Sequence, residues 1–185
     1  MDTKTVATIT VFAALTITLN LSPIKFPAPY ATYLIYQLWE IPIVAAFLLY
    51  GNVVGSFIAL INTLILVAVF PGELLTGPLY NLAAVLSMLL GVGMGRKIAK
   101  KYVQENSKLL LVLFTVSGVA LRVGIMTFVN WAFLRFPPPV GFNMPEEVIL
   151  LSIPLIAVFN ATLALYTVPS GYFVAKVVKS STTPV

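Results

Sequence analysis

Five polar or charged side chains lie inside apolar stretches of the sequence, where such groups are costly. Arg122 and Asn130 interrupt the stretch "GVALRVGIMTFVNWAFLRF", and Glu40, Asn81 and Asn160 occur in three others. A charge at the centre of a membrane helix costs about 2.5 to 3.5 kcal/mol on insertion scales. We therefore expect these side chains to point inward, toward one another or a cavity, where amide groups can hydrogen-bond a polar ligand.

Each of these side chains also has a structural interpretation. An asparagine in a membrane helix often joins two helices through a hydrogen bond worth about 0.6 to 2 kcal/mol. Helix joining and ligand contact therefore both remain open for each asparagine, and Glu40 could equally face water at the membrane interface. For Arg122, a buried structural or coupling role is favoured over ligand contact. Glu40 is the one acidic residue within an apolar stretch, and it is expected to lie too near the membrane surface for a direct ion pair with Arg122.

Catalytic chemistry has few candidates in this sequence. It contains no histidine, no cysteine and only six acidic residues. Thiol nucleophiles, disulfides and imidazole acid–base chemistry are thereby excluded, and no catalytic or metal site is predicted. An intramembrane enzyme acting on lipid is disfavoured, because Glu40 has no acidic partner within the apolar stretches.

The composition is that of an α-helical membrane protein. Of the 185 residues 59% are hydrophobic and 9% charged, against about 25% charged in soluble domains, and the mean hydropathy is +1.00. We expect one domain over residues 1–185, an all-α compact bundle of six transmembrane helices. The predicted helices are Thr5–Leu21, Tyr36–Tyr50, Val53–Phe70, Pro78–Gly95, Leu109–Leu134 and Val148–Val178. Pro42 predicts a kink or partial insertion of the short second helix.

The basic residues orient this bundle. Six spans place both termini on one side of the membrane, and two basic residues, Lys25 and Arg135, fall on the other side. Eight lie on the side of the termini: Lys4, Arg96, Lys97, Lys100, Lys101, Lys108, Lys176 and Lys179. This bias predicts cytoplasmic termini in a multi-pass protein of the plasma membrane. The net charge of +5 is therefore attributed to topology and attraction to anionic lipid, not to nucleic-acid binding.

This orientation assigns a depth to the polar side chains. Glu40, Asn81 and Asn130 fall about one turn inside the outer ends of their helices, and Asn160 lies farther down the last helix. Their shared position predicts a pocket in the outer half of the membrane. Arg122 lies about two turns below Asn130 and is expected to face the interior near the base of this pocket.

The first helix carries a stripe of small side chains. Thr3, Ala7, Thr10, Ala14 and Thr18 recur at helical spacing. Small side chains allow another helix to approach backbone to backbone. The partner could be another subunit, or the sixth or third helix of the same bundle.

The arrangement resembles the S components of energy-coupling factor (ECF) transporters, most closely the riboflavin-specific RibU group. The resemblance is carried by "LWEIPIVAAFLLYGNVVGSFIALINTLIL", "GPLYNLAAVL", "RVGIMTFVNWAFLRFP" and "IPLIAVFNATLAL". It implies that the chain captures a vitamin outside the cell and docks on a coupling membrane subunit with two ATPase subunits. The sequence has no "GxxxxGK[ST]" loop with which to hydrolyse ATP itself.

The resemblance also implies roles for individual residues. Ala7, Thr10 and Ala14 match in character the face that contacts the coupling subunit, although a strict Ala-x-x-x-Ala repeat is missing. The implied vitamin pocket and its aromatic neighbours comprise Asn81, Asn130, Asn160, Glu40, Tyr30, Tyr80, Phe128 and Trp131. No cofactor is implied beyond the transported vitamin.

Several alternatives remain open. The RibU pattern has a lysine where this sequence has Leu163, which leaves room for thiamine, pyridoxine or another small ring compound instead of riboflavin. A stand-alone secondary transporter is disfavoured, because repeated halves and a titratable relay at the membrane midplane are both missing from the sequence.

Overall fold

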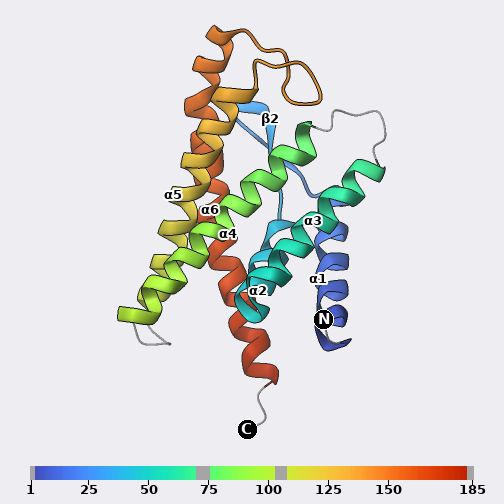
Figure 1. Ribbon diagram of the computed structural model, residues 1–185, viewed down its shortest axis with the longest axis vertical. Helices are drawn as coiled ribbons and strands as arrows, with labels where there is room; N and C mark the ends of the chain where they lie inside the picture. Colours follow the sequence, from blue (N-terminus) through green and yellow to red (C-terminus); the bar gives the residue numbers. More distant parts are fainter. Residues whose placement is uncertain (1–2, 70–75, 103–107, 183–185) are drawn as a thin grey trace.

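The computed structural model describes residues 3–69, 76–102 and 108–182, which form six α-helices and a two-stranded antiparallel sheet (Figure 1). The helices are α1 Thr3–Leu21, α2 Glu40–Tyr50, α3 Asn52–Val69, α4 Thr76–Tyr102, α5 Lys108–Phe133 and α6 Glu146–Thr182. The first residues of α1 and the last of α6 lie toward the same end of the molecule as the adjoining ends of α4 and α5 (Figure 1). We call this the terminal end and the opposite one the far end.

Four of these helices are long and apolar enough to cross a membrane: α3, α4, α5 and α6. The apolar part of α1, Thr5–Leu21, is slightly shorter than α3, and the 11 residues of α2 extend over only about 16 Å, roughly half the thickness of a hydrocarbon core. The described residues therefore form the six predicted helices, but only four of these have the length and composition of a membrane span. Helix α4 continues to Tyr102, beyond the predicted Gly95, while the predicted end at Phe70 lies outside the described residues.

A β-hairpin replaces the predicted start of the second helix. Strands β1 (Phe26–Ala28) and β2 (Ala31–Tyr36) pair antiparallel, with Phe26 opposite Tyr36. The sequence "ATYLIY" of β2 is rich in β-branched and aromatic residues, which favour a strand. Helix α2 begins at Glu40, not at Tyr36. Pro42 thus falls in the first turn, where its missing N–H breaks no helical hydrogen bond.

Glycines set the close packing of α4 against α5. A Cβ atom at Gly91 would lie 2.2 Å from the carbonyl oxygen of Ser117, and one at Gly95 would lie 2.4 Å from the Ser117 hydroxyl. The two helices therefore approach to backbone contact at these positions, as small residues permit. This contact aligns α4 and α5, which carry two walls of the cavity described below.

We expect Gly91→Ala to destabilise the protein by about 1 to 3 kcal/mol, because the added methyl group must push α5 away from α4. Gly124→Ala on α5 is a matched control, since a Cβ there meets no atom within 4 Å. Thermal unfolding in detergent measures both. Equal melting temperatures for Gly91→Ala and the parent would contradict the close approach.

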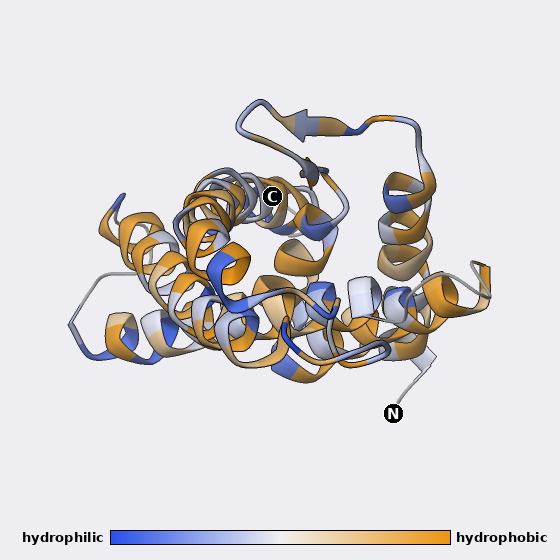
Figure 2. Ribbon diagram, turned by 90° about the horizontal axis from the view of Figure 1, so that it is seen from above, coloured by the Kyte–Doolittle hydropathy of each residue, from blue (hydrophilic) through white to orange (hydrophobic). Residues whose placement is uncertain are grey.

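The interior is apolar, and so is much of the outside. Val44, Ile58, Val85, Met88 and Val168 are completely buried between the helices. Many large apolar side chains on α1, α3, α5 and α6 are exposed, and most of the helical ribbon has the colour of hydrophobic residues (Figure 2). A surface of this kind suits contact with lipid chains.

Candidate binding site

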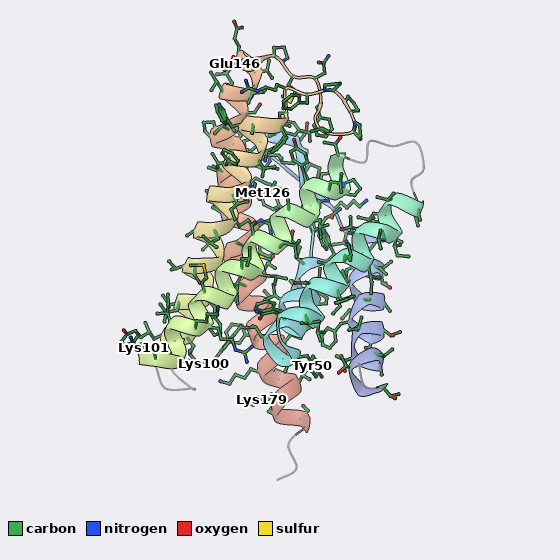
Figure 3. The ribbon with its side chains drawn as sticks, viewed as in Figure 1. Tyr50, Lys100, Lys101, Met126, Glu146 and Lys179 are labelled. Atoms are coloured by element: carbon green, nitrogen blue, oxygen red, sulfur yellow. The ribbon has the colours of Figure 1, made fainter. Side chains whose placement is uncertain are left out.

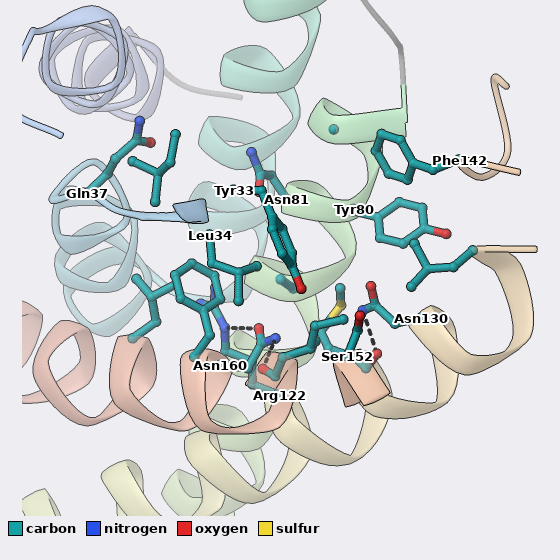
Figure 4. Close-up of a pocket in the computed structure, with 18 of the residues that line it drawn as sticks. Tyr33, Leu34, Gln37, Tyr80, Asn81, Arg122, Asn130, Phe142, Ser152 and Asn160 are labelled. Atoms are coloured by element: carbon teal, nitrogen blue, oxygen red, sulfur yellow. Dashed lines mark hydrogen bonds between the residues drawn. The ribbon is translucent and has the colours of Figure 1, made fainter. Parts of the chain in front are cut away.

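A cavity of about 550 Å³ lies between the hairpin and helices α4, α5 and α6 (Figure 4). Its size is typical of small-molecule sites, which range over roughly 300 to 1,000 Å³. Most lining side chains are apolar or aromatic. The hydrogen-bonding side chains in the lining are Tyr33, Gln37, Trp39, Glu40, Tyr80, Asn81, Arg122, Asn130, Ser152 and Asn160.

Helical periodicity brings side chains of α5 and α6 to this cavity. Arg122, Met126 and Asn130 are four residues apart along α5 and all are buried. Ser152 and Asn160 are eight residues apart on α6 and also line the cavity. Residues spaced by four lie on one face of a helix, so each helix presents a regular stripe of mixed polarity to the cavity.

An ion pair forms part of the cavity lining. The Arg122 guanidinium donates two hydrogen bonds to the Glu40 carboxylate: from Nη2 to Oε1 over 2.9 Å, and from Nη1 to Oε2. Its Nε donates to Oδ1 of Asn160 over 2.9 Å (Figure 4). Arg122 is 2% exposed and Glu40 3%. The network therefore joins α2, α5 and α6 around a fully desolvated pair.

The prediction that Glu40 lies too near the surface to pair with Arg122 is wrong. It assumed that the second helix begins at the outer interface. Residues 31–36 before it run as an extended strand, and an extended chain advances about 3.3 Å per residue. The hairpin therefore carries the chain inward before α2 begins, and Glu40 at the first turn of α2 reaches the depth of Arg122.

The asparagines differ in how much hydrogen-bonding capacity they retain. Asn130 donates from Nδ2 to the carbonyl of Met126 over 2.7 Å, and within the described residues no donor reaches its Oδ1. Asn160 uses both ends of its amide, donating to Ile156 over 2.9 Å and accepting from Arg122. Asn81 is exposed and lines the cavity from α4. Asn130 and Asn81 thus have the greater free capacity for a ligand.

The loop after α5 closes one side of the cavity. Phe142 and Met144 line it, and the Thr76 hydroxyl donates to the carbonyl of Pro139 over 3.0 Å, which ties the loop to α4. Tyr80 lines the cavity from α4, and its hydroxyl donates to the carbonyl of Val140 over 3.3 Å. Tyr80 also makes an edge contact with the ring of Phe142.

The sequence-based placement of Trp131 at the pocket is corrected by the structure. Trp131 is 45% exposed and contacts Arg135 and Phe128 on the outer surface of α5, and neither Trp131 nor Phe128 lines the cavity. One residue further along a helix turns the side chain by about 100°, so Trp131 points away when Asn130 points in.

Tyr30 also lies outside the cavity lining, at the hairpin turn, where its hydroxyl hydrogen-bonds that of Tyr36 over 2.5 Å. Desolvation and this hydrogen bond raise the pKa of Tyr30 to about 12, so the phenol stays neutral at physiological pH.

The cavity is also lined by aromatic residues that were not predicted from the sequence. They are Tyr33 on β2, Trp39 before α2, Phe142 in the loop after α5, and Phe159 on α6. A signal existed for Phe159, which lies four residues before Leu163 and therefore shares its face of α6. The contribution of Tyr33 and Trp39 depended on the path of the hairpin and had no periodic signal.

The small-residue stripe of α1 faces outward. Thr3, Ala7, Thr10, Ala14 and Thr18 are all exposed, whereas Ile9, Ala13, Thr16 and Asn20 form the buried face. Asn20 donates to Asn62 of α3 over 3.1 Å. The alternative that the stripe packs inside this bundle is therefore wrong, and the stripe is available to a partner outside the described chain.

Comparison with known proteins places the fold. No protein-family model and no curated protein matches this sequence. Separately, the described residues contain no group of three acidic residues that could hold a metal ion. A solved structure of the S component of a bacterial ECF transporter is similar over 100% of both chains, with 20% sequence identity and a TM-score of 0.78. The chain therefore has the fold of an ECF transporter S component.

Proposed function

We propose that this chain is the substrate-binding S component of an ECF-type transporter in the plasma membrane. The observation that carries the proposal is the cavity of about 550 Å³, with its amide and aromatic lining, in a fold shared with an S component over its full length. The cavity lies toward the far end, because it is lined by the first residues of α4, the second half of α5 and the first half of α6. With the termini in the cytoplasm, as the basic residues favour, its ligand enters from outside.

The favoured ligand is a small vitamin with a flat ring, riboflavin before thiamine or pyridoxine. The rings of Tyr33, Tyr80 and Phe159 provide apolar surface for a ring system. The amides of Asn81 and Asn130 provide donors and acceptors for polar ring edges or hydroxyl groups. Leu163, buried in the lining, adds no positive charge, so an alternative vitamin stays within the proposal.

Transport requires partners. We propose that a coupling membrane subunit and two ATPase subunits supply the energy, and that Ala7, Thr10 and Ala14 contact the coupling subunit. The exposure of all three side chains supports this role, because a helix of another subunit can approach them closely.

Calorimetric titration of the purified chain with riboflavin, thiamine and pyridoxine tests the ligand. We expect saturable binding of one vitamin at one site, and flavin absorbance in the untreated preparation if that vitamin is riboflavin. If none of the three vitamins binds to protein that still unfolds cooperatively, the proposed binding of these vitamins is contradicted.

Asn130→Ala is expected to weaken binding of the identified vitamin by about 1 to 3 kcal/mol, because a buried hydrogen bond to the ligand is lost. Trp131→Leu, one position further along α5 and outside the lining, should bind with unchanged affinity. Titration of both variants measures the difference. Equal affinities would place the ligand away from this face of α5.

A further inference from the structure

A second cavity, of about 430 Å³, lies at the terminal end and plays no part in the site described above. It is formed where the end of α2 meets α4, the start of α5, and α6. Its lining falls into two chemical groups. The apolar and aromatic part comprises Leu48, Leu49, Ala99, Leu110, Phe114, Tyr172 and Ala175, and the basic part Arg96, Lys100, Lys176 and Lys179.

The apolar part is the buried one. Ala99, Leu110, Phe114 and Ala175 are each 9% exposed or less, whereas Lys100 and Lys176 are exposed. Lysine side chains commonly extend along apolar surface and keep the ammonium group in a polar layer. The cavity therefore combines an apolar base with a cationic rim.

Within the described residues, no carboxylate pairs with Arg96, Lys100 or Lys176 of this rim. The described residues hold three carboxylates, and none lines the cavity. Glu40 is bound to Arg122, and Glu146 and Glu147 begin α6 at the far end. Lys100, Lys101 and Lys179 lie at the terminal end, with Glu146 at the opposite one (Figure 3). The site is thus suited to an anion.

We propose that this cavity binds an anionic phospholipid of the leaflet on the side of the termini. Arg96, Lys100 and Lys176 would hold the phosphate, and the base formed by Leu110 and Phe114 would hold the first part of an acyl chain. A soluble phosphate compound uses only the rim and leaves the apolar base in water.

The surface beside the cavity supports a ligand from the membrane. Ile98 on α4, Leu109 on α5 and Phe173 on α6 are 48%, 49% and 55% exposed. Large apolar side chains exposed on these three helices match a lipid-facing surface. An acyl chain in the cavity would therefore continue onto a face that is itself suited to lipid.

Native mass spectrometry of the full chain in detergent, titrated with dioleoyl phosphatidylglycerol, tests the site. We expect the parent to bind one molecule of this lipid more tightly than dioleoyl phosphatidylcholine. The double variant Lys100→Gln/Lys176→Gln should bind it about 25-fold more weakly, from about five-fold for each cation. The double variant Lys100→Arg/Lys176→Arg should retain binding.

The matched control is Lys97→Gln/Lys101→Gln, which removes the same charge from α4 outside the cavity lining. Its affinity should stay within about two-fold of the parent. If both glutamine variants lose the same affinity for phosphatidylglycerol, the loss comes from net charge alone, and the site is overturned. Equal binding of the two lipids would also overturn it. Glycerol 3-phosphate binding as tightly as the lipid would assign the cavity to a soluble phosphate compound instead.

Discussion

Arg122→Met is expected to lower the free energy of unfolding by about 3 to 5 kcal/mol, because it leaves the Glu40 carboxylate buried without its partner. The change also removes the donor to Asn160, so α6 loses its link to α5 at the cavity. Thermal or denaturant unfolding in detergent measures the effect. Arg135→Met should cost far less, since Arg135 lies just beyond the far end of α5, where its guanidinium contacts Trp131.

A double variant distinguishes the loss of the whole Glu40–Arg122 ion pair from the loss of one partner. Replacing a whole buried ion pair by apolar side chains is often nearly neutral, whereas removing one partner is not. Glu40→Leu/Arg122→Met should therefore be more stable than Arg122→Met alone. Two outcomes would show that the side chains are not coupled as the geometry indicates. In one, Arg122→Met has the same free energy of unfolding as the parent. In the other, the double variant is less stable than Arg122→Met.

Ala14→Trp is expected to abolish ATP-dependent uptake in proteoliposomes that also contain the coupling and ATPase subunits. Ala14 lies on the exposed face of α1, so the indole ring needs no space within this chain. It would instead hold a partner helix several ångströms away and prevent close contact. Binding of the identified vitamin to the isolated variant should equal that of the parent, because α1 contributes no side chain to the cavity.

Leu15→Trp provides the control for this variant. Leu15 is 47% exposed on α1 but lies about 100° around the helix from Ala14. Uptake by Leu15→Trp should stay close to that of the parent. Uptake that survives in Ala14→Trp would remove the α1 stripe from the coupling interface, whereas loss of vitamin binding in that variant would indicate that α1 supports the cavity indirectly.

The sequence was sufficient to predict the parts of the fold that follow from helical periodicity. Long apolar runs indicated α3, α5 and α6 to within a few residues, apart from the end of the third helix. Asn130 and Asn160 interrupt such runs, and the structure places both at one cavity. A polar side chain in an apolar environment must be directed inward, so its position is readable without knowledge of the tertiary contacts.

The hairpin and the Glu40–Arg122 ion pair could not be predicted from helical periodicity. The composition of residues 31–36 favours a strand, but nothing in residues 26–36 indicates the path that the chain takes relative to the helices. Without that path, the start of the second helix was placed at the outer interface, and Glu40 was therefore predicted to lie too near the surface. The outward direction of Trp131, by contrast, was within reach, because its neighbour Asn130 was already assigned to the inner face.

The hairpin has a consequence for how ligand preference can evolve. Strand β2 supplies Tyr33, Leu34 and Ile35 to the cavity wall, yet the main apolar core is made by the helices and Trp39. Tyr33 and Ile35 are 61% and 39% exposed, so changes there disturb little packing. Variation along this strand can reshape one wall of the cavity without weakening the bundle, and selectivity can therefore drift while folding stability is conserved.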